Sequence, residues 1–351
     1  MGGAVTDARL LARAMRDPAS VAALDAAGWT ALLAMARAEQ MIGTLALRLE
    51  GQPMPGAAAR ILADARGSAA QQRLAALWEA EMARRVLHGV GCPVVLLKGT
   101  AFVAAGLRAG EGRSIGDLDI LVPRGSIDAV EKALLGAGWE WVKPDPYDDA
   151  YYRRWMHELP PLIHRDRDRM IDVHHTILPL TARITPDAAA LIADSVALAD
   201  GFRVLSPEDM ICHAAAHLFA DGDLAGGMRN LWDIDRLVRQ FGEQDRDFCL
   251  SVFERAWEHG LSSSVRRALR LAQQMYGTPV KGYRSPIRVS LNEERSDALF
   301  RRRLTARDSW GRATRPWTRF VFYLRSHWLR MPPAMLARHL WTKWRKGYRP
   351  A

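Results

Sequence analysis

The stretch that decides the fold is Asp117-Leu118-Asp119-Ile120-Leu121-Val122 (residues 117–122). Its aliphatic residues predict a strand, and side chains alternate between the two faces of a strand. Asp117 and Asp119 therefore project from one face, while Leu118 and Ile120 can pack into a core from the other. Two neighbouring carboxylates repel each other unless a cation neutralises them. The pattern predicts a strand that presents a pair of metal-binding carboxylates.

A third carboxylate, Asp172, lies in a similar setting between Ile171 and Val173. Two apolar runs, residues 162–164 and 170–174, flank a polar segment and predict a hairpin. If its second strand lies beside residues 117–122, three carboxylates converge and can hold a pair of Mg²⁺ ions, which suit in-line phosphoryl displacement. His174 shares a strand face with Asp172, so it is a candidate for contact with a phosphate or an acceptor. A purely structural role for His174 stays open.

A second candidate element is the turn Lys98-Gly99-Thr100, which follows the buried strand predicted at residues 94–97. Glycine at this place lets backbone amides approach a phosphate, and the N-terminus of the following helix favours anions. Thr100 could donate its hydroxyl, and Lys98 could supply positive charge. Arg113 is a further phosphate candidate. The alternatives are an exposed lysine and an ordinary polar loop around Arg113.

Around these motifs the chain alternates between helical and strand-like segments. Residues 1–90 read as helices with a break at 51–56, and helices return from Thr185. Residues 126–137 predict a helix capped by Ser126, and residues 139–142 a third strand. The block order indicates an α+β fold, a small mixed sheet flanked by helical regions. We expect four parts: an N-terminal helical segment (1–88), the sheet-containing core (89–178), a C-terminal helical region (179–295) and a basic, Trp-rich helical tail (296–351).

Composition restricts the class of protein. Hydrophobic residues make up 49% of the 351 residues, enough for a sizeable core. The cysteines are Cys92, Cys212 and Cys249, and their number and spacing argue against a disulfide framework and for a reducing compartment. The first 20 residues do not resemble a signal peptide, and no apolar run reaches the roughly 20 residues that span a bilayer. We expect a cytoplasmic protein, with peripheral attachment to the inner membrane as an open option.

Positive charge is concentrated at the C-terminal end. Residues 301–351 contain 14 Lys or Arg residues and one acid, Asp308, a net charge of +13, whereas the whole chain carries +10. Basic and aromatic residues interleave there, which is compatible with RNA or with an anionic membrane surface. A third option is a helical extension whose tryptophans pack on the body while its arginines reach solvent.

Two further pairs of residues have helical spacing. His213 and His217 are four residues apart, but no glutamate follows His213 as in a His-Glu-x-x-His zinc motif, so we expect packing or buried hydrogen bonds. Asp233 and Asp235 are two residues apart on a predicted helix, a spacing that turns them away from each other. We expect them to be surface or capping residues, with the alternative that one of them faces the active-site cleft.

The chain resembles the uncharacterised bacterial nucleotidyltransferase family, which belongs to the polymerase-β-like superfamily. The motifs that carry the resemblance are residues 96–99, 113–122 and 171–174, and it extends over roughly residues 85–240. The resemblance implies a sheet of nucleotidyltransferase type and a nucleoside triphosphate (NTP) as donor. It implies that Asp117 and Asp119 bind metal and that Asp172 helps to activate the acceptor. Gly99 matches the glycine of the phosphate turn, whereas Thr100 replaces the serine of the wider superfamily.

The resemblance implies a magnesium-dependent transfer of a nucleotidyl group to an acceptor hydroxyl. Some relatives are encoded near exopolysaccharide genes, which links the expected acceptor to exopolysaccharide biosynthesis. Two alternatives stay open: a toxin-like nucleotidyltransferase that acts on RNA or protein, and a non-catalytic nucleotide-binding or scaffold protein. The basic tail favours the first alternative. Retention of three mutually repelling carboxylates argues against the second.

Overall fold

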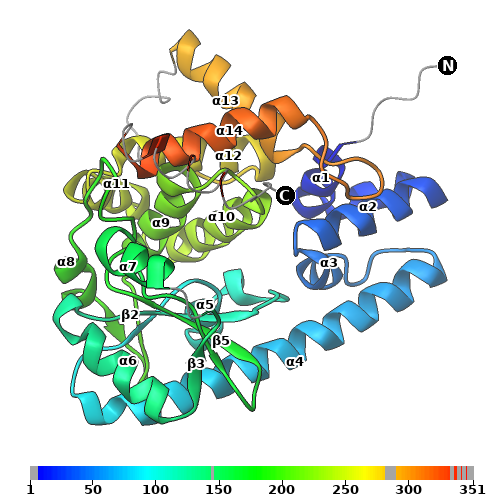
Figure 1. Ribbon diagram of the computed structural model, residues 1–351. Coiled ribbons are helices and arrows are strands. Elements are labelled where there is room, and N and C mark those ends of the chain that lie inside the picture. The colour runs from blue at the N-terminus through cyan, green and yellow to red at the C-terminus, as the bar shows by residue number, and fades with distance from the viewer. Residues whose placement is uncertain are drawn as a thin grey trace.

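The computed structural model describes residues 7–143, 146–280 and 290–332, together with Leu336, Ala337, Trp341 and Arg345. The predicted α+β class is confirmed, because one seven-stranded sheet lies among helical regions at both ends of the chain (Figure 1). Within the described residues, no helix has the length and apolar character needed to cross a membrane.

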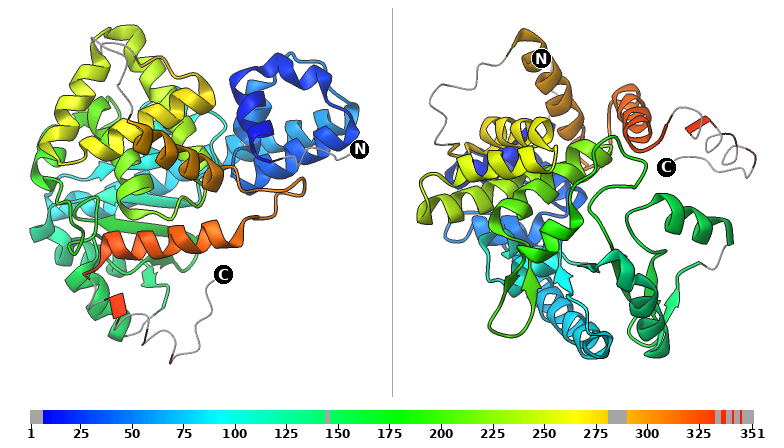
Figure 2. Two further views of the ribbon diagram at one scale, coloured as in Figure 1. Left: turned by 90° about the horizontal axis from the view of Figure 1, so that it is seen from above. Right: turned by 90° about the vertical axis from the view of Figure 1, so that its left-hand side faces the viewer.

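The N-terminal region is helical, as predicted. Its helices are α1 (Arg9–Arg16), α2 (Ala26–Ala38), α3 (Ile42–Arg48) and α4 (Gly56–Leu87). Figure 2 shows α1 to α3 gathered at one side of the molecule, while the long helix α4 runs on beneath the sheet. The break between α3 and α4 coincides with the Pro and Gly residues of the predicted break at 51–56.

The sheet has the strand order β3-β4-β5-β2-β1-β7-β6. The strands are β1 (Val95–Leu96), β2 (Asp117–Leu121), β3 (Trp139–Trp141), β4 (Leu162–His164), β5 (Arg169–His174), β6 (Val196–Ala197) and β7 (Arg203–Val204). β4 and β5 form the predicted hairpin, and β5 then pairs in parallel with β2. Leu118, Ile120 and Ile171 are buried on these central strands, so their apolar face belongs to the core.

Helices cover both faces of the sheet. Around the strands lie α5 (Lys98–Ala104), α6 (Ile127–Gly136), α7 (Pro146–Trp155) and α8 (Ala188–Ala193). The C-terminal helices are α9 (Pro207–Ala215), α10 (Gly227–Gln244), α11 (Phe248–Glu258), α12 (Ser262–Tyr276), α13 (Leu291–Leu304) and α14 (Pro316–Arg330). In Figure 1, α9 and α10 lie above the sheet and α4 lies below it. The carboxyl-bearing strand β2 is thus enclosed between helices from distant parts of the sequence.

Two local expectations were wrong in whole or in part, and one open option is narrowed. The predicted return of helices from Thr185 misses β6 and β7, which have two residues each and are too short to leave a period-two pattern. Ser126 precedes α6 but makes no side-chain capping hydrogen bond, because a short 3₁₀ turn, Arg124–Ser126, leads into the helix. The option in which the tail tryptophans pack on the body does not apply to Trp310 and Trp317, which are exposed.

A close contact between two glycines joins the N-terminal helices to the loop before β2. A β-carbon on Gly43, in α3, would lie 2.6 Å from the carbonyl oxygen of Gly112, and one on Gly112 would lie 2.5 Å from that of Gly43. Gly112 also has a left-handed backbone, with φ +63°. Only glycine fits at this contact, which positions the loop that carries Arg113 towards β2.

We therefore predict that Gly112→Ala destabilises the protein by about 2–4 kcal/mol, through backbone strain and the clash with α3. Gly116→Ala is the matched control, because Gly116 lies in the same loop, has no atom near its β-carbon position and does not have a positive φ. We expect Gly116→Ala to change stability by no more than about 0.5 kcal/mol. Urea unfolding of both variants measures the difference, and equal midpoints would contradict the prediction.

Candidate active site

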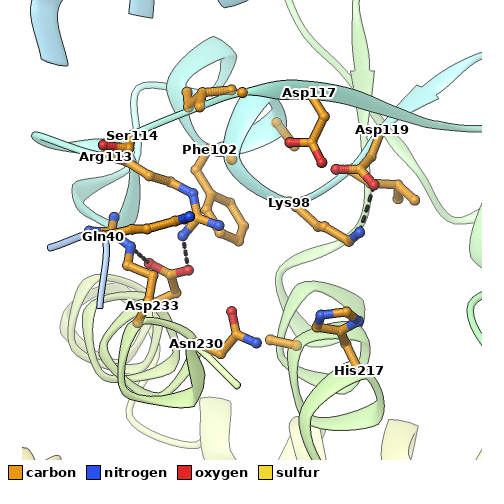
Figure 3. A pocket seen from close by; sticks show the side chains of 18 of the residues that line it. Gln40, Lys98, Phe102, Arg113, Ser114, Asp117, Asp119, His217, Asn230 and Asp233 are labelled. Carbon is orange, nitrogen blue, oxygen red and sulfur yellow. Dashed lines mark hydrogen bonds and ion pairs between the residues drawn. The ribbon is translucent and has the colours of Figure 1, made fainter. Parts of the chain in front are cut away.

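The three carboxylates named by the sequence analysis lie together. The parallel register of β2 and β5 places Asp119 opposite Asp172, and Asp117 opposite Met170. One oxygen from each of Asp117, Asp119 and Asp172 lies within 4.8 Å of the other two. Figure 3 shows Asp117 and Asp119 on the same strand, with the Lys98 side chain extended towards Asp119. Adjacent strands therefore bring together acids that are 53 residues apart in the sequence.

Asp119 is the most buried of the three and accepts two hydrogen bonds. The Lys98 ammonium (Nζ) donates to its Oδ1 at 2.6 Å, and His174 Nε2 lies 3.0 Å from the same oxygen. Burial opposes ionisation, but Lys98 and His174 together hold the pKa of Asp119 well below its usual range. Because an ionised carboxylate only accepts hydrogen bonds, Nε2 of His174 must carry the proton. Both contacts fall on Oδ1, so Oδ2 takes part in neither.

The pKa values of Asp117 and Asp172 are shifted in the opposite direction, upwards. Burial and the neighbouring Asp119 raise the pKa of Asp117. Burial, followed by the charges of Asp119 and Glu158, raises the pKa of Asp172 to about 7. Oδ1 of Asp172 is buried and makes no hydrogen bond to any described residue. A pKa near neutrality makes Asp172 suited to exchange a proton with a bound group.

This cluster fits a divalent cation. Its oxygen atoms are hard ligands at a separation that one ion can bridge, and the buried Oδ1 of Asp172 lacks a partner that a cation would supply. A bound cation would also offset the repulsion that raises the pKa values of Asp117 and Asp172. The arrangement is therefore compatible with the metal that the sequence analysis expects.

At Lys98 and Thr100, the structure of the predicted phosphate turn differs from the expectation. Lys98 begins α5 with a left-handed backbone, φ 49°, and its side chain turns back to Asp119. Thr100 is 1% exposed, and its hydroxyl has no hydrogen-bond partner among the described residues, so it points away from open solvent. Gly99 lines the cleft, and a β-carbon there would lie 2.6 Å from Nε of Arg113. The glycine thus makes room for an arginine.

Arg113 forms an ion pair with Asp233 of α10. Asp233 is 2% exposed and also lies 3.1 Å from Nε of Arg229, so one carboxylate holds two guanidinium groups. Both aspartates are buried, so the expectation of surface or capping residues was wrong, whereas the alternative that one of them faces the cleft agrees with Asp233, which lines it. Asp235 is fully buried and binds Arg239 and the Thr278 hydroxyl. Arg229 and Arg239 stand four residues from these acids, a helical spacing that the sequence analysis overlooked. Arg113 and Thr278 lie at distant sequence positions, which local spacing could not show.

Asp117 and Asp119 line a cleft of about 700 Å³ between the sheet and the C-terminal helices, and Asp172 lies beside them. Its far wall includes Gln40, from the end of α2, and Asn230, from α10 (Figure 3). His213 and His217 both line the cleft; His213 is buried, whereas His217 is exposed, so the packing interpretation is compatible with His213 alone. His217 lies in a π-helical turn, Ala216–Asp221, a rare geometry that is frequent at functional sites. Sequence analysis missed Gln40 and Asn230, which belong to no motif.

The raised pKa of Asp172 leads to a prediction for the metal-free protein. Between about pH 4 and 7, the folded chain retains a proton on Asp172 that the unfolded chain has lost, so this residue makes stability fall as the pH rises through that window. Asp172→Asn removes the titration. We expect the variant to melt several degrees above wild type at about pH 8 in EDTA, with little difference at about pH 4. Parallel pH profiles of the two melting temperatures would contradict the assignment.

Comparison with known proteins adds one match. The family model described as "Uncharacterised nucleotidyltransferase" matches residues 25–277, more than half of the chain. No curated protein matches the chain. The matched region begins in the N-terminal helices, contains the whole sheet and the cleft, and ends after α12. The chain, which carries its three clustered carboxylates within this region, therefore belongs to the uncharacterised nucleotidyltransferase family and is a transferase.

Proposed function

We propose that the chain is a magnesium-dependent enzyme that transfers a nucleotidyl group from an NTP to an acceptor hydroxyl. The observation that carries the proposal is the convergence of Asp117, Asp119 and Asp172 at the edge of a cleft large enough for a nucleotide. In the proposed reaction the acceptor oxygen forms a bond to the α-phosphorus. The bond between the α-phosphorus and the bridging oxygen breaks, and pyrophosphate leaves.

The proposal gives each carboxylate a role. Asp117 and Asp119 hold Mg²⁺, with Asp172 as a third ligand, and when bound the metal neutralises phosphate charge. The pKa of Asp172, about 7, supports a second role as the group that takes up the acceptor proton. His174 donates to Asp119 and so fixes how this carboxylate is presented. In this arrangement His174 supports a ligand, whereas a direct contact with phosphate would require it to leave Asp119.

Positive charge in the cleft supports binding of the triphosphate. Lys98 and Arg113 both line the cleft, with Gly99 between them on the same wall. Lys98 lies next to the carboxylates, whereas Arg113 is turned towards Asp233. We propose that these two side chains and the backbone at Gly99 contact the phosphates. Thr100 would then support the turn from behind, because its hydroxyl is buried.

The far wall supports recognition of the base. Gln40 and Asn230 each carry an amide that both donates and accepts hydrogen bonds, the chemistry that reads the edge of a nucleobase. Figure 3 shows both side chains on the side of the cleft away from Asp119. A nucleotide bound with its phosphates near Lys98 would direct its base towards this wall.

The acceptor is also part of the proposal. We take it to be a hydroxyl group used in exopolysaccharide biosynthesis. RNA or protein acceptors, as in toxin-like relatives, are the alternative, and the exposed Trp317 beside the arginines of the tail supports it. An anionic membrane surface would be contacted by the same residues.

The test of nucleotide binding is isothermal titration with ATP, GTP, CTP and UTP, with and without Mg²⁺. We expect at least one NTP to bind only with Mg²⁺, and Asp117→Asn to weaken that binding about 100-fold, because a metal ligand is lost. Asp64→Asn, on the exposed surface of α4, is the control and should bind as wild type does. Binding that is unchanged in Asp117→Asn, or absent from folded wild type, would contradict the proposal.

A further inference from the structure

A second cluster of metal-binding side chains lies directly behind Asp119. It consists of His157 and Glu158, in the segment before β4, and His174, at the end of β5. One potential ligand atom from each lies within 4.8 Å of the other two. The cluster shares no residue with the carboxylate site. One of its members, His174, also contacts Asp119 of that site. It is therefore a separate arrangement of two imidazoles and one carboxylate.

The backbone holds the three residues in place. Glu158 forms a β-bridge with His174, and the amide of His175 donates to the carbonyl of His157 at 2.9 Å. The amide of Leu159 donates to the carbonyl of Val173, also at 2.9 Å. The segment thus lies along β5 like a short extra strand. Ligands on such a rigid support can keep the geometry that a metal requires.

The distances between the potential ligand atoms fit coordination of one shared metal ion better than direct hydrogen bonds. Oε2 of Glu158 lies 3.4 Å from Nδ1 of His174 and 3.7 Å from Nε2 of His157. Nδ1 of His174 is buried and makes no hydrogen bond of acceptable geometry to the residues that the structure describes. Two ligand atoms bound to one tetrahedral Zn²⁺ stand roughly 3.3 Å apart, and their imidazole centroids roughly 5 Å apart. The centroids of His157 and His174 are 5.2 Å apart.

The protonation state of His174 also favours a metal. Its Nε2 faces Asp119, so a neutral ring that donates from Nε2 directs the lone pair of Nδ1 towards Glu158 and His157. A histidine that binds metal through one nitrogen commonly donates the other N–H to a carboxylate. Burial lowers the pKa of His157, which keeps its ring neutral and able to bind. With a metal on Nδ1, Asp119 would be the carboxylate partner of the metal-binding histidine.

The ligand set selects the kind of metal. Imidazole nitrogens suit Zn²⁺ and related transition metals, whereas Mg²⁺ prefers oxygen ligands alone. Two histidines and one glutamate leave a fourth position for water. The Glu158 side chain is 18% exposed and that of His157 11%, so the cluster can be reached from solvent. Three carboxylates, Asp117, Asp119 and Glu158, lie in or near this cluster. The neighbouring cation is Lys98, which contacts Asp119, so negative charge exceeds positive charge around the cluster.

We propose that His157, Glu158 and His174 bind one Zn²⁺ ion, which fixes the proton of His174 on Nε2 and so orients Asp119. His174 acts here as a positioning residue, because it reaches the nucleotide site only through Asp119. The proposal does not depend on nucleotide transfer, since the ion would bind without NTP or Mg²⁺.

The experiment measures metal binding alone, with full-length protein that has been stripped with a chelator. Zn²⁺ is titrated in competition with a coloured chelator, and Co²⁺ is added to record the absorption bands of a four-coordinate site. We expect one Zn²⁺ per chain. His157→Ala and Glu158→Gln should each weaken binding at least about 100-fold, and Asp119→Asn about 10–100-fold through its hydrogen bond to His174. Loss of the Co²⁺ bands should follow the same order.

Controls separate this site from others. Asp117→Asn changes the carboxylate site without touching His174, and His88→Ala removes an exposed histidine, so both should bind Zn²⁺ as wild type does. Glu158→Gln conserves side-chain shape and covers the case in which His157→Ala does not fold. The proposal is overturned if folded wild type binds no Zn²⁺, or if Zn²⁺ binding survives Glu158→Gln unchanged. Because no nucleotide is present, either result leaves the test of NTP binding separate.

Discussion

The parallel pairing of β2 with β5 is the constraint on which the site depends. It sets Asp119 beside Asp172 and leaves Asp117 on the same face, so that like charges meet in a partly buried place. Ionised carboxylates in such a cluster destabilise the folded state. The raised pKa values of Asp117 and Asp172 reflect this destabilisation. The apolar residues on the other face of the same strands stabilise the register, because a slip by one residue would expose them and bury the acids.

The cleft is assembled through ion pairs between distant segments. Asp233 of α10 binds both Arg113, from the loop before β2, and Arg229, one helical turn earlier. Arg229 donates in turn to Thr44 of α3 and to the carbonyl of Ala109, so the network joins the N-terminal helices, the loop before β2 and the C-terminal helix α10. Removing one partner of such a buried set leaves the others uncompensated. The wall opposite the carboxylates is therefore as constrained as the strand that carries them.

These two kinds of constraint explain what the sequence could predict. The alternation in residues 117–122 and the setting of Asp172 depend on neighbours one or two residues away, so β2, the β4–β5 hairpin and the α+β class followed from local pattern, whereas the short strands β6 and β7 did not. The link between Arg113 and Asp233 spans 120 residues, and no local pattern encodes it. His157 was missed for the same reason, because its partner His174 becomes its neighbour only when the segment pairs with β5.

The C-terminal tail packs on the rest of the protein and also carries exposed side chains. Phe322 of α14 packs edge-to-face on Phe300 of α13, and Arg307 pairs with Glu39, a residue that lines the cleft. Trp317, on the same helix as Phe322, is 80% exposed, and no acid follows Asp308 in the sequence. Deleting the tail would therefore remove core packing and a support of the cleft together with any partner surface. A role in RNA or membrane contact has to be separated from folding by substituting the exposed tryptophans and arginines alone.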